Sequence, residues 1–114
     1  SSSVSLYALQ DGRNEPLVLA SAGSNWYKAR SQAEFILDDV NDLELLITPF
    51  VTQRVETIHI PLGELPARPA KATRIQLILS FSSENHATAR VVDKGFGELF
   101  PPEDIVIRKD FLIS

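Results

Sequence analysis

Residues 73–81 read Thr-Arg-Ile-Gln-Leu-Ile-Leu-Ser-Phe, and this stretch decides the fold class. One set of alternating positions carries Ile75, Leu77, Leu79 and Phe81, and the other carries Arg74, Gln76, Ile78 and Ser80. Successive side chains of a β-strand point to opposite faces, whereas a helix needs apolar residues three and four apart. The period of two therefore predicts a strand with one face in a hydrophobic core.

Shorter runs of the same kind lie on both sides of this strand. The predicted strands are residues 4–10, 16–20, 34–37, 43–48, 55–60, 73–81, 88–92 and 105–112. Segments rich in Gly, Asp, Asn, Ser and Pro separate them, which is typical of hairpins and loops. The seven prolines include three in residues 61–69, which argues against a long helix in the middle of the chain. The pattern predicts an all-β sandwich or barrel of about eight strands.

The size of the chain favours a single domain. Its 114 residues, of which 44% are hydrophobic, are enough to bury one core. We expect that domain to span residues 4–114, with Ser1–Ser3 as an expression remnant or a disordered end. The absence of any methionine is expected of a fragment of a longer protein. The absence of cysteine excludes disulfides and thiolate chemistry and favours a reducing compartment, so we expect a cytoplasmic protein.

Charge and motif content exclude several function classes. Eleven Lys and Arg against fifteen Asp and Glu give a net charge of −4 with no basic stripe, so no nucleic-acid partner is expected. No apolar run approaches the roughly 20 residues that cross a bilayer, so no membrane partner is expected. Because no Gly-rich phosphate loop, Ser-His-acid set or metal-ligand spacing is present, the sequence predicts no enzyme, no cofactor and no metal site.

The second half of the chain carries an ordered set of short motifs. From Leu62 it reads Leu-Gly-Glu-Leu-Pro-Ala-Arg-Pro, and then comes the alternating strand of residues 75–81. A short turn follows, and a second strand ends in Val92-Asp93-Lys94. Each motif is common by itself, so their order carries the information.

The first half supplies motifs in a matching order. They are Ser5-Leu6, Asp11-Gly12, Pro16-Leu17-Val18, Ser31-Gln32, Phe35, Asn41 and the strand of residues 43–47. Over residues 5–94 the chain resembles the substrate-binding domain of the Hsp70 heat-shock chaperones. The resemblance implies an antiparallel β-sandwich whose loops at one end cradle an extended peptide.

The resemblance also implies a site and partners. A peptide-binding pocket would be lined by Phe35, Leu45 and Ile47, with Ala8 and Gln10 on the neighbouring strand. An apolar pocket gives affinity, and backbone hydrogen bonds to an extended ligand give tolerance of sequence. The implied partners are extended polypeptide segments and the parent's ATPase domain, in which any ATPase activity would reside. The alternative for each pocket residue is ordinary core packing.

The chain departs from the family at the rim of the predicted groove. Two residues that form an apolar arch over the peptide in the family match Asp11 and Asp38 here. Two facing carboxylates repel, so either the arch is absent or the matching positions differ. The long hairpin after residues 43–47 is also shortened, to residues 51–54. These departures indicate a divergent Hsp70-like protein.

Other hypotheses remain open. The same sandwich with a filled pocket would be a structural or docking module, and a carbohydrate-binding sandwich would use Trp26 and Tyr27. Phe96, between two glycines, is expected to be buried; if it is exposed, it marks a docking surface for another domain of the parent. The acidic cluster is expected to be a solvated turn that, at a groove rim, favours basic peptides; its members are Asp38, Asp39, Asp42 and Glu44.

Overall fold

The computed structural model describes the backbone of residues 4–10, 13–20, 30–37, 42–49, 54, 56–83 and 86–112. Side chains are described for residues 32–37, 43–45, 54, 56–83 and 86–112. Within these ranges every regular element is a β-strand, paired in antiparallel sheets, and none is a helix. The prediction of an all-β fold is therefore confirmed. The described residues also contain no helix that is long and apolar enough to span a membrane.

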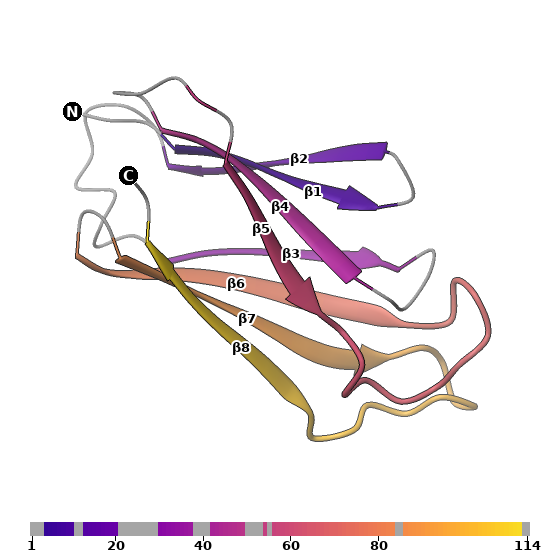
Figure 1. The fold of residues 1–114 in the computed structure, drawn as a ribbon. Helices are drawn as coiled ribbons and strands as arrows, with labels where there is room; N and C mark the ends of the chain where they lie inside the picture. Colours follow the sequence, from indigo (N-terminus) through magenta and orange to yellow (C-terminus); the bar gives the residue numbers. More distant parts are fainter. Residues whose placement is uncertain are drawn as a thin grey trace.

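The strands of the described ranges form two four-stranded sheets. In chain order they are β1 (Val4–Gln10), β2 (Arg13–Ala20), β3 (Arg30–Ile36), β4 (Asp42–Pro49), β5 (Glu56–Pro61), β6 (Arg74–Ser83), β7 (His86–Gly95) and β8 (Val106–Leu112). The first sheet has the order β2-β1-β4-β5 and the second the order β3-β6-β7-β8. Figure 1 shows them as two layers, with β3, β6, β7 and β8 in the lower layer of the view.

Strand β6 lies inside the second sheet, between β3 and β7. Its core-facing residues Ile75, Leu77 and Leu79 are at most 1% exposed, as the alternation predicts. Ile78 points to the opposite face and is nevertheless buried. It stands in register with Gln32 on β3 and Arg90 on β7, so the side chains of these two neighbours share its face of the sheet.

Both sheets contribute to one hydrophobic core. From the first sheet come Leu43 and Leu45 of β4 and Ile60 of β5, all completely buried. The second sheet adds the inward residues of β6 and, from β7 and β8, Ala87, Ala89, Val91, Ile107 and Phe111. Burial stabilises the fold by roughly 1.5–3 kcal/mol for each large aliphatic side chain. The core therefore holds the two layers together and fixes which face of each strand is inside.

The predicted strands agree with the observed ones, with differences at their ends. Residues 4–10 match β1 and residues 105–112 match β8 within one residue. Strand β3 begins at Arg30 and not at Glu34, because its first half pairs with residues 77–80 of β6. Strand β7 is likewise longer than residues 88–92. Backbone hydrogen bonds to a neighbouring strand extend these elements beyond the segment that side-chain alternation marks.

Candidate functional site

Two residues of the predicted peptide pocket have described side chains, and both belong to the core. Leu45 is completely buried, and Phe35 is half-buried against the same cluster. Phe35 lies on β3 opposite Ile75 of β6, so it comes from the second sheet, whereas Leu45 comes from the first. The fold thus brings the two residues into one apolar environment between the sheets.

The remaining predicted site residues are described by backbone register alone or not at all. Ala8 pairs with Leu45, and Ile47 pairs with Leu6, so β1 and β4 are neighbouring strands. Gln10 is the last residue of β1. The side chains of Ala8, Gln10 and Ile47 lie outside the described residues. Asp11, Asp38, Trp26 and Tyr27 also lie outside them.

A buried ion pair that the sequence motifs did not predict lies at the C-terminal end of β7. The two guanidinium Nη atoms of Arg68 donate to the two carboxylate oxygens of Asp93 at 2.7 and 2.8 Å. The side chains are 4% and 0% exposed. Parallel bidentate hydrogen bonds of this kind fix the orientation of both groups as well as attracting their charges.

Asp93 accepts two further hydrogen bonds from backbone amides. The amide of Gly95 donates to Oδ1 at 3.0 Å, and the amide of Glu103 donates to Oδ2 at 2.9 Å. The hydrogen bonds from Arg68, and then those from the two amides, outweigh burial and lower the pKa of Asp93 to about 2. Asp93 is therefore ionised at neutral pH, and its charge is balanced by an arginine whose own pKa is raised chiefly by the same hydrogen bond.

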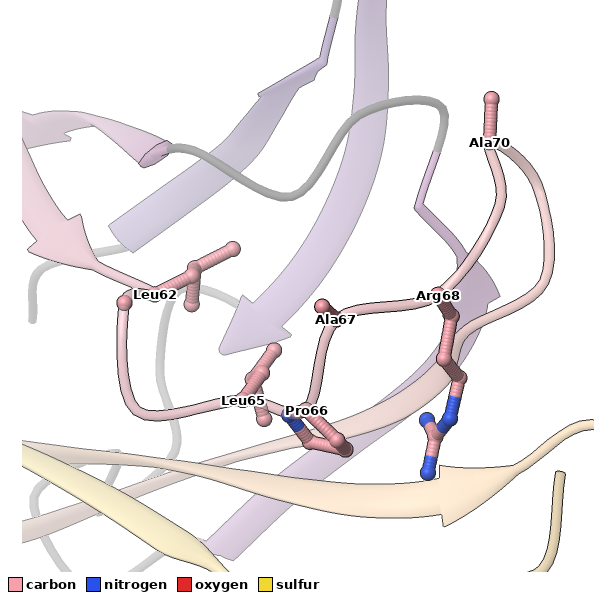
Figure 2. Close-up of a pocket in the computed structure, with 7 residues that line it drawn as sticks. Leu62, Leu65, Pro66, Ala67, Arg68 and Ala70 are labelled. Atoms are coloured by element: carbon pink, nitrogen blue, oxygen red, sulfur yellow. The ribbon is translucent and has the colours of Figure 1, made fainter.

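The ion pair joins three separate segments. Arg68 belongs to the loop between β5 and β6, Asp93 lies in β7, and the carbonyl oxygen of Pro101 in the loop before β8 accepts from Nη2 of Arg68 at 3.2 Å. In Figure 2 the Arg68 guanidinium extends from its loop toward the end of β7. We call this set of contacts the Arg68–Asp93 clasp. It holds two long loops against one end of the second sheet.

A pocket of about 360 Å³ lies along the loop that carries Arg68. Figure 2 shows its lining, which consists of Leu62, Gly63, Leu65, Pro66, Ala67, Arg68 and Ala70. Leu62 and Leu65 are buried in the core, so the floor of this pocket is fixed. The Arg68 guanidinium is already hydrogen-bonded to Asp93, which neutralises its charge. The pocket therefore offers a ligand mainly apolar contacts.

A second pocket, of about 400 Å³, opens where the two clasped loops meet. Its lining comes from residues 69–72 and 96–100. Phe96 is 37% exposed and Leu99 is 86% exposed, so the expectation that Phe96 is buried was wrong. Phe100, by contrast, is half-buried, and its carbonyl accepts from the Phe96 amide. The two glycines do take positive φ values, but they do not bury Phe96.

Gly95 is required at the start of this loop. Its φ is +68°, in the left-handed region that glycine favours. A Cβ at this position would lie 2.5 Å from the carbonyl oxygen of Phe100 and 2.5 Å from the nitrogen of Pro102. Gly97 also has a positive φ, of +65°, but a Cβ there would meet nothing within 4 Å. Close backbone packing therefore constrains Gly95, and conformation alone constrains Gly97.

Part of the acidic cluster can be placed. Glu44, on β4, lies 3.5 Å from Nδ1 of His59, which stands opposite it on β5. His59 is exposed on β5, which ends the first sheet. Asp38, Asp39 and the side chain of Asp42 lie outside the described residues. Among the side chains that are described, no three His, Cys, Asp or Glu residues are grouped as metal ligands would be.

One feature of the sequence could have predicted that Asp93 is buried and paired. On β7, Ala87, Ala89 and Val91 alternate as buried residues, and Asp93 occupies the next position of the same face. A carboxylate on a core-facing position must find a partner, because an unpaired buried charge is strongly destabilising. The strand pattern therefore predicts that Asp93 is paired. It cannot identify Arg68 as the partner, which is 25 residues away.

The fold and these sites define an all-β domain with antiparallel sheets, clasped at one end by a buried Arg–Asp pair. A family model described as "Domain of unknown function (DUF8552)" matches residues 1–113. The chain belongs to this family. Neither the curated proteins nor the solved structures gave a match.

Proposed function

We propose that this chain is an eight-stranded, Hsp70-like substrate-binding β-sandwich that holds extended apolar polypeptide segments. In this proposal it is a binding module of a cytoplasmic chaperone and not an enzyme. ATP-dependent steps belong to the parent's ATPase domain. The ligand lies across one end of the first sheet and inserts an apolar side chain between β1, β3 and β4, beside Phe35 and Leu45.

One observation carries the proposal, namely the register of β1 against β4. The strands are antiparallel, and Leu9 pairs with Glu44, so the last residue of β1 lies close to the beginning of β4. The segments that follow Gln10 and precede Asp42 are therefore attached at the same end of the sheet. Those segments contain Asp11 and Asp38, the two residues assigned to the groove rim. This register supports a groove framed by the two segments.

The pocket chemistry agrees with an apolar ligand. Leu45 and Phe35 belong to a core built almost entirely from aliphatic and aromatic side chains. Burying one leucine of a ligand in such surroundings contributes roughly 1.5–3 kcal/mol, to which backbone hydrogen bonds add without demanding a sequence. Because Leu45 is completely buried in the unliganded chain, the proposal requires the end of the core around Leu45 to open when a peptide binds.

Fluorescence anisotropy with labelled, extended, Leu-rich peptides tests the proposal. We expect saturable binding by the wild type and at least roughly tenfold weaker binding by Leu45→Ala, since the variant removes most of the apolar contact. Leu79→Ala is the matched control, because Leu79 is as deeply buried but lies on β6 in the other sheet. Both variants are compared where circular dichroism shows them folded. An equal loss of binding in both variants would contradict the assignment of the pocket to Leu45.

A second function is supported by a different observation. Leu45 is completely buried, whereas Phe96 and Leu99 are exposed at the clasped end of the domain. This distribution favours a structural or docking module that contacts another domain of its parent through Leu99 and Phe96. A photo-crosslinking amino acid at position 99 of the full parent protein would attach to that domain. No peptide binding together with a specific crosslink at position 99 would favour the docking module over the peptide groove.

A further inference from the structure

Strand β8 is an edge of the second sheet. Among the described strands its one neighbour is β7, and it ends the order β3-β6-β7-β8. Figure 1 shows it at the margin of the lower layer. An edge strand presents a row of backbone N–H and C=O groups that can pair with another chain. Its sequence, Val-Ile-Arg-Lys-Asp-Phe-Leu, therefore decides what can be added there.

The two faces of β8 are clearly separated. Ile107 and Phe111 are buried in the core. On the opposite face Val106 is 52% exposed and Leu112 is 69% exposed. Between these two lie Arg108 and Asp110, both exposed and on the same face because they are two residues apart. The exposed face of β8 therefore carries, in chain order, an apolar, a positive, a negative and an apolar side chain.

This order is self-complementary: two copies of β8 match each other when they run antiparallel with their Lys109 residues opposite each other. In an antiparallel pair of two β8 strands centred on Lys109, Val106 faces Leu112, and Arg108 faces Asp110. Each contact occurs twice, as two-fold symmetry requires. Opposite charges and apolar pairs directly across from each other stabilise neighbouring antiparallel strands. We propose that β8 is a self-association edge, at which a second copy of this chain adds its own β8 and joins the two sheets into one.

Other arrangements fit less well. Shifting one β8 strand by two residues along the other places Arg108 opposite Arg108, or Asp110 opposite Asp110, depending on the direction. Like charges directly across from each other are destabilising. Of the edges of the first sheet, β5 ends in Pro61, which has no N–H to donate. Strand β3, the other edge of the second sheet, exposes Gln32, Glu34 and Ile36 among its described side chains, so it presents one apolar position there where β8 presents two.

The proposed register has one unfavourable contact, between the two Lys109 residues. Lys109 is exposed, and its long side chain keeps the ammonium group in water, which reduces the repulsion. Lysine on an edge strand also protects against indiscriminate pairing. In this assembly it makes the association weak and reversible, so that the charge pairs select the register. The contact involves one seven-residue strand from each copy, so we expect a small interface and weak association.

Two hydrogen bonds within the chain orient the Asp110 side chain. Its carboxylate accepts from the Thr88 hydroxyl at 2.6 Å and from Nε of Arg108 on its own strand at 3.2 Å. These hydrogen bonds orient Asp110 on the outer face. The inference does not depend on the peptide groove, because β8 belongs to the other sheet.

Sedimentation equilibrium of the 114-residue chain, from roughly 10 μM to roughly 1 mM, tests the proposal. The wild type should show a monomer–dimer equilibrium. Arg108→Asp and Asp110→Arg should each weaken it at least roughly tenfold, because each converts two attractive contacts into repulsive ones. An equimolar mixture of the two variants should form a heterodimer, since Asp at 108 then faces Arg at 110 of the other chain. Lys109→Thr should tighten the wild-type dimer.

Arg74→Asp and Glu64→Arg are the matched controls, because they make the same charge changes at exposed sites away from β8 and should leave association unchanged. Thermal unfolding confirms that every variant is folded. A wild type that stays monomeric over the whole range, with no tightening by Lys109→Thr, would overturn the proposal and assign Lys109 a purely protective role. A mixture of the two charge variants that does not associate would overturn the register.

Discussion

Two arginine–aspartate pairs, one at β7 and one on the neighbouring strand β8, have the same chemistry but differ in burial and geometry. The Arg68–Asp93 pair has side chains 4% and 0% exposed and two short hydrogen bonds. The Arg108–Asp110 pair has side chains 59% and 48% exposed and a single contact of 3.2 Å. The first is enclosed by two loops, and the second faces solvent at the sheet edge.

The difference shows how burial changes the role of the same ion pair. In the interior, removing one charge leaves the other without water or a partner, so the pair is needed for the fold. At the surface water replaces the partner at little cost, so the pair adds almost nothing to folding. The exposed pair remains available to another molecule. The clasp thus serves the structure of this chain, and the edge pair is suited to association.

The most severe change we expect is Asp93→Ala. It leaves the Arg68 guanidinium buried without its counter-charge and removes the acceptor of the Gly95 and Glu103 amides. The free energy of unfolding should fall by about 3–5 kcal/mol, measured by urea denaturation. Thr88→Ala, which removes an exposed hydrogen bond on the same strand, is the control. A loss of under 1 kcal/mol in Asp93→Ala would show that the clasp behaves as a surface pair.

Gly95→Ala should come next. The added Cβ meets the backbone at Phe100 and Pro102 and also forces alanine to a positive φ, so we expect a loss of about 3 kcal/mol. Gly97→Ala adds the same methyl group at nearly the same φ in open space and should cost only about 1 kcal/mol. Thermal denaturation of the two variants measures the difference. Equal losses would mean that the loop before β8 is not closely packed on the clasp.

Acid should weaken the clasp specifically. The pKa of Asp93 is lowered from 3.8 to about 2 in the folded chain, so below about pH 4 the unfolded chain binds the proton more readily than the folded chain. The contribution is fully present above pH 4 and is lost as the pH falls to about 2. It amounts to about 2 kcal/mol. Urea denaturation of wild type and Asp93→Asn at several pH values should give curves that converge over this interval. Parallel curves would contradict the assignment.

The smallest effect is expected at the exposed pair. Arg108→Ala should leave the free energy of unfolding of the monomer unchanged within the error of urea denaturation, because both partners are already hydrated. The measurement is made at a low protein concentration, where association does not contribute. A clear destabilisation of the monomer would show that the edge pair, like the clasp, supports the fold.

The strand pattern was readable from the sequence because it depends on local alternation. On β6 the positions of Ile75, Leu77 and Leu79 on one face are sufficient to predict the strand and its buried side. The same logic identified β1 and β8 close to their observed limits. It failed for the first half of β3, because Arg30 and its neighbours are in a strand through backbone pairing with β6 and not through their own side chains.

The site was less accessible to sequence reasoning. Phe35 and Leu45 were recognised as apolar and inward-facing, and both lie in or against the core, but whether a peptide reaches them stays a prediction. Phe96 was expected to be buried, because glycines on both sides suggested a sharp inward turn. Gly95 does take a positive φ, yet Phe96, which follows it, is 37% exposed.

The sequence by itself determined that this is a β-protein and which face of β6 is buried, and the alternation along β7 also contains the position of a buried carboxylate, which was recognised only afterwards. These properties follow from the two-residue period of a strand, which each segment carries in its own side chains. The tertiary structure alone decided that Arg68 meets Asp93 and that β8 is left at an edge. Both depend on how distant segments are placed in space, and no local pattern encodes a contact between residues so far apart in the chain.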